Sequence, residues 1–270
     1  MPVLVAMLYA APAMAQDQPS LADHHVLLVP VFFFGPGGHG SQWETNVSIA
    51  STATESVSMP VPLLGFCSDP DGQIDPNEAR SICPGYASPS GLLLYVPKTL
   101  DLKQLHVNSR VRDVSRAASS AGTQIPAVRE SDFRSEEFLL LDIPSDARFR
   151  SNLRIYGGTL RFNAEQRIIH PGGDVGIEIY DSRDLRVPLV TTAVELSAPQ
   201  TIEGSPYLVR PGHASFGDLV AAFPQLANVP SYTIRIVPYQ SLASPPTESS
   251  VWAFVSITNN DTQEVTTVVP

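Results

Sequence analysis

The sequence is poor in charge, in basic side chains and in cysteine. Only 16% of its 270 residues are charged, and 17 Lys and Arg stand against 27 Asp and Glu, which gives a net charge of -10 at pH 7. Proteins that bind nucleic acids neutralise phosphates with basic patches, so this balance argues against a nucleic-acid partner. The two cysteines, Cys67 and Cys83, have no CxxC spacing, which disfavours a metal or redox role for the pair.

Long apolar runs are also missing after the N-terminus. Residues 1–15 are uncharged and end in Ala13-Met14-Ala15, a pattern typical of a signal peptide cleaved before Gln16. No later stretch reaches the 18 apolar residues of a spanning helix. We therefore expect a secreted or periplasmic protein without a membrane span. In an oxidising compartment Cys67 and Cys83 are expected to form a disulfide that stabilises the fold by about 3 kcal/mol.

Motifs of nucleophilic, phosphate and zinc chemistry are absent or incomplete. There is no G-x-S-x-G sequence, and the nearest group, His213, Ser215 and Asp218, is too compact for side chains that must converge from separate parts of a fold. Ser215 and Asp218 instead have the spacing of a helix capping box. The glycine-rich segment 35–41 lacks a P-loop lysine and precedes a strand pattern, which favours a hairpin or bulge. The six histidines show no HExxH spacing.

One acidic segment between the cysteines is similar in spacing to a calcium loop. With Gly72 at the sixth position of an EF-hand-like loop, suitable residues fall at the third, fifth, ninth and twelfth positions: Asp69, Asp71, Asp75 and Glu78. Cys67 stands where the first ligand is normally Asp, and Pro70 and Pro76 interrupt the loop. A solvated acidic turn is therefore favoured over a weak calcium site, and no other cofactor is expected.

Period-2 alternation of apolar and polar residues runs through most of the chain. It is clear at 43–49, 153–156, 177–180 and 234–237, with Gly-, Pro- and Asn-rich turns between, which predicts many short strands. Residues 26–34 are apolar at nearly every position, so we expect burial of both faces, with Pro30 at an edge or bulge. Phe216, Leu219, Val220 and Phe223 lie on one helical face, which predicts one short helix beginning at Ser215 and ending before Pro224.

The turn-forming residues 144–147 offer the most natural division of the chain. Each side then has about the length of one immunoglobulin-like sandwich, roughly 100 residues. The sequence thus predicts an all-β protein with a signal peptide at 1–15 and two immunoglobulin-like β-sandwich domains. The first, at 16–144, contains the disulfide loop, and the second, at 145–270, contains the short helix.

Four segments resemble a family of uncharacterised secreted bacterial proteins. They are 30–37 together with Ser41-Gln42-Trp43, 153–156, 217–220 and 252–260. The resemblance covers most of the mature chain and implies a two-part, all-β exported protein. It implies no activity and no site, because none of these segments is a catalytic motif.

Two functional hypotheses follow from these patterns. The first is a secreted, non-enzymatic structural, adhesive or binding protein whose partner is an extracellular protein or glycan. The alternative is an extracellular hydrolase whose Asp, Glu and His residues come together from distant loops, which strand patterns alone do not reveal. A concave cleft with two close carboxylates or a perturbed histidine would favour the enzyme.

Overall fold

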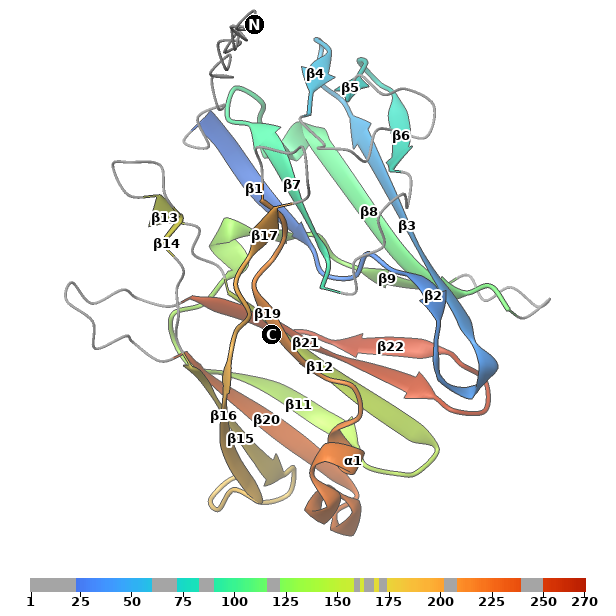
Figure 1. Ribbon diagram of the computed structural model, residues 1–270, viewed down its shortest axis with the longest axis vertical. Helices are drawn as coiled ribbons and strands as arrows, with labels where there is room; N and C mark the ends of the chain where they lie inside the picture. The colour runs from blue at the N-terminus through green and yellow to red at the C-terminus, as the bar shows by residue number, and fades with distance from the viewer. Residues whose placement is uncertain are drawn as a thin grey trace, which may run out of the picture.

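The structure is a computed structural model that describes residues 23–59, 72–82, 90–115, 122–157, 161–162, 168–169, 174–201, 208–238 and 250–270. Antiparallel strands make up most of these ranges, and the only α-helix within them is α1 (Leu219–Ala222) (Figure 1). This confirms the all-β class and the short helix in the second half. Within the described ranges no helix has the length and apolarity needed to cross a membrane.

The first half of the chain forms two sheets, which we call sheet 1 and sheet 2. Sheet 1 has the order β2-β3-β8-β9, with β6 beside β3, and consists of β2 (Phe34–Pro36), β3 (Gln42–Ser51), β6 (Ala79–Ile82), β8 (Leu105–Asp113) and β9 (Thr123–Ile125). Sheet 2 has the order β10-β1-β7 and consists of β1 (His24–Val29), β7 (Leu92–Pro97) and β10 (Val128–Arg129).

The second half forms two four-stranded sheets. Sheet 3 has the order β19-β12-β21-β22 and consists of β12 (Phe149–Gly157), β19 (His213–Phe216), β21 (Val251–Asn259) and β22 (Val265–Val268). Sheet 4 has the order β11-β20-β15-β16 and consists of β11 (Phe138–Pro144), β15 (Asp174–Asp181), β16 (Val190–Glu195) and β20 (Ser231–Pro238). Figure 1 shows sheets 1 and 2 in the upper part of the molecule and sheets 3 and 4 in the lower part.

Short elements lie between the strands of these sheets. Two-stranded pairs are formed by β4 (Val57–Ser58) with β5 (Gln73–Ile74), β13 (Arg161–Phe162) with β14 (Ile168–Ile169), and β17 (Gln200–Thr201) with β18 (Leu208–Arg210). The described 3-10 turns are η2 (Gly38–Gly40), η3 (Leu102–Gln104), η4 (Glu130–Asp132) and η5 (Pro224–Asn228).

Three apolar layers hold the sheets together, because successive side chains of a strand point to opposite faces. On β1, Leu27 and Val29 enter the core between sheets 1 and 2, whereas Leu28 points the other way. A second core lies between sheets 3 and 4 and contains Leu153 and Ile155 of β12. The expected burial of both faces at 26–34 is thus confirmed for β1, the central strand of sheet 2, and Pro30 follows its end.

The third layer joins the two halves, and we call it the junction layer. It is formed mainly by the outward faces of sheets 2 and 3, with Ile125 added from β9 of sheet 1, and contains Leu28, Val31, Leu93, Tyr95, Ile125, Val128, Tyr156, Trp252 and Phe254. The Tyr156 hydroxyl is fully buried there and donates a hydrogen bond to the carbonyl of Pro30. Sheets 2 and 3 are therefore apolar on both faces over this region, and each half covers the other.

The turn at 144–147 is not a linker between the two halves. Strand β11, which precedes it, pairs with β20, and Phe138, Leu140 and Ile143 lie in the core between sheets 3 and 4. The turn is closed by the Phe149 amide, which donates to the Asp146 carbonyl at 2.9 Å. Residues 138–144 thus belong with the second half, whereas the sequence had suggested a boundary after them.

The expected helix start at Ser215 is wrong. Ser215 lies in β19 opposite Arg154, and the N-cap of α1 is Asp218, whose carboxylate accepts from the amides of Val220 and Ala221 at 3.1 and 3.4 Å. Ser and Asp are both good N-cap residues, so the sequence is compatible with a helix that begins after either residue. Pairing with β12 keeps Ser215 extended, and Asp218 takes the cap.

Candidate functional site

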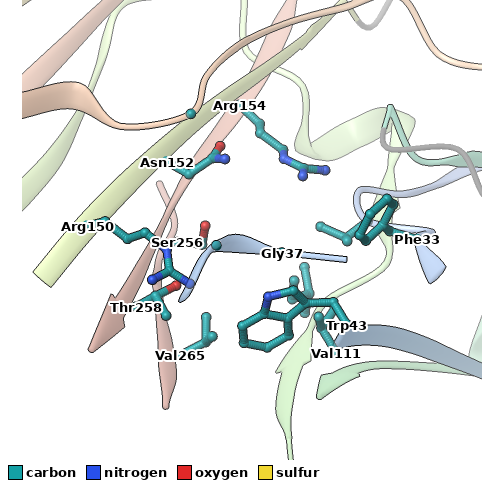
Figure 2. Close-up of a pocket in the computed structure, with 14 residues that line it drawn as sticks. Phe33, Gly37, Trp43, Val111, Arg150, Asn152, Arg154, Ser256, Thr258 and Val265 are labelled. Atoms are coloured by element: carbon teal, nitrogen blue, oxygen red, sulfur yellow. The ribbon is translucent and has the colours of Figure 1, made fainter. Parts of the chain in front are cut away.

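A cleft of about 390 Å³ opens beside the junction layer, between sheets 1 and 3 (Figure 2). Five separate parts of the chain supply its walls. Its lining residues are Val31, Phe33, Gly37, Gly38, Trp43, Val111, Ile125, Arg150, Asn152, Arg154, Gly217, Ser256, Thr258 and Val265. A volume of this size is in the range of small-molecule sites.

The cleft forms where the outward face of sheet 3 changes from apolar to polar. Tyr156 pairs with Trp252 in the register of β12 and β21, and both lie in the junction layer. Further along the same two strands and on the same face, Asn152 pairs with Ser256, and Arg150 pairs with Thr258. All four of these polar residues line the cleft, so the polar stretch of this face is the part that stays open.

The opposite wall is apolar and partly aromatic. Trp43 of β3 and Phe33 flank the cleft, and Figure 2 shows the Trp43 indole extending toward its centre. The turn between β2 and β3 lies directly against this indole. A Cβ atom built on Gly37 would come within 2.3 Å of Trp43 Cδ1 and Nε1, so only glycine leaves the ring in this position.

The glycine-rich segment between Gly35 and Ser41 forms a hairpin turn, as its position before a strand predicts. Strands β2 and β3 pair antiparallel on either side of it. The Gly37 amide donates to the Ser41 carbonyl at 2.8 Å, and the Ser41 hydroxyl donates to the Gly38 carbonyl at 2.7 Å. These bonds hold the turn at the mouth of the cleft.

Arg150 is the most unusual residue of the polar wall. Its Nη1 and Nη2 atoms donate to the side-chain oxygens of Asn260 and Gln263, each at 2.8 Å. Both acceptors are neutral amides, and within the described residues Arg150 forms no ion pair. Burial lowers the pKa of this guanidinium, partly offset by the charges of Asp218 and Asp113, so it is a cation held in a partly dehydrated place.

Two further polar groups complete this wall. The Arg154 Nη1 atom donates to the Pro30 carbonyl at 3.4 Å, which ties the arginine to the junction between the halves. The Oδ1 atom of Asn152 is buried and has no hydrogen-bond partner among the described residues. A buried carbonyl oxygen without a donor is costly, so Asn152 is a polar group of this wall whose hydrogen bonding the described residues do not complete.

The group His213, Ser215 and Asp218 does not form a catalytic arrangement. His213 stacks on Tyr156, and its Nδ1 atom lies 3.1 Å from the Ser197 hydroxyl. Burial lowers the pKa of His213. The Asp218 carboxylate caps α1. Neither His213 nor Asp218 is thus a hydrogen-bond partner of Ser215.

The acidic segment is only half within the described residues. Cys67, Cys83, Asp69 and Asp71 lie outside them, so the disulfide and the complete calcium loop stay predictions. Glu78 accepts a hydrogen bond from the Asp75 amide at 3.1 Å and pairs with Arg80 at 2.8 Å, while Asp75 accepts from Ser56 at 2.8 Å. No cluster of three or more potential metal ligands occurs in the part of the chain that the structure describes.

No protein-family model, curated protein or solved structure matches the chain.

Proposed function

We propose that this protein is an exported, non-enzymatic binding protein whose ligand site is the cleft between sheets 1 and 3. The chemistry of the lining carries the proposal. One wall offers donors and acceptors from Arg150, Asn152, Ser256 and Thr258, and the other offers the apolar surface of Trp43 and its neighbours. Such a combination of apolar walls with a few polar groups is typical of sites that bind a ligand.

The alternative of a hydrolase has less support in the described residues. General acid-base catalysis needs a carboxylate, histidine or similar group within reach of the bound molecule. The cleft is lined by no Asp, Glu, His or Cys side chain from the described ranges. We therefore favour recognition over catalysis. The volume of the cleft suits one small molecule or one protruding group of an extracellular protein or glycan.

The proposal includes export, membership of the family of uncharacterised secreted bacterial proteins and a relation to immunoglobulin-like domains. The pairs β12–β19 and β15–β20 correspond to the B–E and C–F pairs of an immunoglobulin sandwich. Strand β21 departs from that plan, because it pairs with β12 rather than with the preceding strand β20. The relation therefore concerns the pairing of the central strands rather than the complete topology.

A bulky side chain placed in the cleft of the full-length protein tests the site. A Cβ atom at Gly217 meets nothing within 4 Å and its φ is not in the left-handed region, so Gly217→Trp places an indole in the cleft without displacing backbone. Val187 is 71% exposed on a loop of sheet 4, and Val187→Trp is the matched control.

The probe is the neutral fluorescent dye 6-propionyl-2-(dimethylamino)naphthalene, which becomes brighter in apolar surroundings. We expect saturable binding to the parent and to Val187→Trp, and affinity weaker by about tenfold or more in Gly217→Trp. Equal affinity in all three proteins would place binding elsewhere and refute the proposed site.

A further inference from the structure

We infer that the cleft selects ligands that carry a carboxylate on an apolar body. This inference rests on the proposed function, because it names the chemical class that the same cleft would bind. It depends on three features, which are a guanidinium without a counter-charge among the described residues, a local excess of positive charge and an apolar wall facing them.

The first feature is the state of Arg150. A guanidinium has five N–H donors, and two of the donors of Arg150 are occupied by the oxygens of Asn260 and Gln263. These two bonds fix the group in place, so its remaining donors are already oriented and lose little freedom when a ligand binds. A carboxylate is an acceptor-only group that can take two of them in parallel.

The second feature is the charge around the cleft. The whole protein carries a net charge of -10, yet the described lining contains the Arg150 guanidinium and no carboxylate. Asp113 and Asp218, which influence Arg150 over a distance, are held elsewhere. Asp113 Oδ1 accepts from the amide of Gln42 at 3.0 Å, and Asp218 caps α1. A bound anion would supply the counter-charge that the described residues do not place beside Arg150.

The third feature decides what the anion is attached to. Across the cleft from Arg150 lie Trp43, Phe33 and Val111, whose side chains offer no hydrogen bonds apart from the indole N–H (Figure 2). A sugar acid would bury its hydroxyl groups against this wall without partners. An aromatic or aliphatic body would gain from the same contact. One guanidinium without a counter-charge also matches a monoanion better than a doubly charged phosphate.

The carboxylate has two possible sources, which are a free small organic acid and the carboxyl end of a polypeptide with an apolar last residue. Calorimetry on the full-length protein compares 3-phenylpropionate with 3-phenylpropionamide, and acetyl-Gly-Gly-Phe with its C-terminal amide. We expect each acid to bind about tenfold or more tightly than its amide. Binding of phenylpropionate alone identifies a small acid, and binding of both acids identifies the polypeptide end as a further source.

Variants then assign the preference to Arg150. Arg150→Gln should abolish the difference between acid and amide, while Arg183→Gln should keep it, because Arg183 is an exposed arginine paired with Asp181 at 2.6 Å. Since Arg150 also holds the turn after β21, Arg150→Lys serves as a second variant that keeps the positive charge. We expect it to keep a reduced preference for the acid, with unchanged far-ultraviolet circular dichroism.

The outcomes separate this inference from the proposed function. If acids and amides bind equally and Gly217→Trp weakens both, the cleft binds ligands but does not select carboxylates. If acid binding is unaffected by Gly217→Trp, both the inference and the proposed site are overturned. Two results would refute the inference alone, provided that the neutral dye still binds in the cleft. One is tighter binding of glucuronate than of 3-phenylpropionate. The other is no binding of 3-phenylpropionate or acetyl-Gly-Gly-Phe at millimolar concentration.

Discussion

Tyr232 allows a quantitative test of the core between sheets 3 and 4. Its side chain has 0% exposure on β20, and its hydroxyl makes no well-formed hydrogen bond with the neighbouring Ser151. Burial raises the pKa of the Tyr232 phenol from 10.0 to about 12. The folded state therefore favours the neutral phenol over the phenolate.

This pKa shift fixes the sign and the size of a pH effect on stability. Because the folded pKa is the higher one, the contribution of Tyr232 is fully present below pH 10 and is lost as the pH rises toward 12. One pKa unit corresponds to 1.36 kcal/mol, so the parent loses about 1.4 kcal/mol by pH 11 and about 2.7 kcal/mol in total. Tyr232→Phe cannot ionise and shows none of this loss.

The measurement is urea unfolding of the parent and Tyr232→Phe between pH 8 and pH 11. At pH 8 the variant should be at least as stable as the parent, because removing a poorly bonded buried hydroxyl is neutral or stabilising. The buried Tyr156, whose pKa is also raised by burial, is present in both proteins and cancels in the difference. A difference in unfolding free energy that stays constant from pH 8 to pH 11 would contradict the burial of this phenol.

Two further predictions concern the turn beside the cleft and the helix cap. Gly37→Ala should displace the Trp43 indole, shift its fluorescence and weaken dye binding by about tenfold, whereas Gly38→Ala, whose Cβ comes no closer than 4.0 Å to a neighbouring atom, should bind as the parent does. The same emission and affinity in both alanine variants would mean that the turn does not constrain the ring. Asp218→Ala should lower the free energy of unfolding by about 1 kcal/mol, and Ser215→Ala should change it by no more than about 0.5 kcal/mol. If urea unfolding shows a larger loss of stability for Ser215→Ala than for Asp218→Ala, Ser215 and not Asp218 is the N-cap.

Much of the strand architecture is predictable from side-chain alternation. The run at 26–34 predicts two buried faces, and β1 has them, with Leu27 and Leu28 in different apolar layers. Alternation does not say which strands pair, because pairing depends on contacts between residues far apart in the sequence. That is why β11 could be assigned to the wrong half, although its apolar character was evident.

The cleft was not predicted, because its residues are distant in sequence and of ordinary types. A signal was nonetheless present in the outward positions of β21, which read Trp252, Phe254, Ser256 and Thr258. The change from large apolar to small polar residues on one face indicates where a covering sheet ends. The role of Arg150 has no such signal in the sequence, because which described residues surround it is known only once the strands are assembled.

The junction layer also bears on whether the two halves can be separated by genetic recombination. Sheets 2 and 3 each present a second apolar face that only the other half covers, and Tyr156 donates its hydrogen bond across that boundary to Pro30. A gene fragment encoding one half would yield a chain with this face bare, and exposed apolar surface of that kind promotes aggregation. A recombination event that moved one half alone would leave this face uncovered and would separate the two walls of the cleft, so both features depend on the two halves staying together.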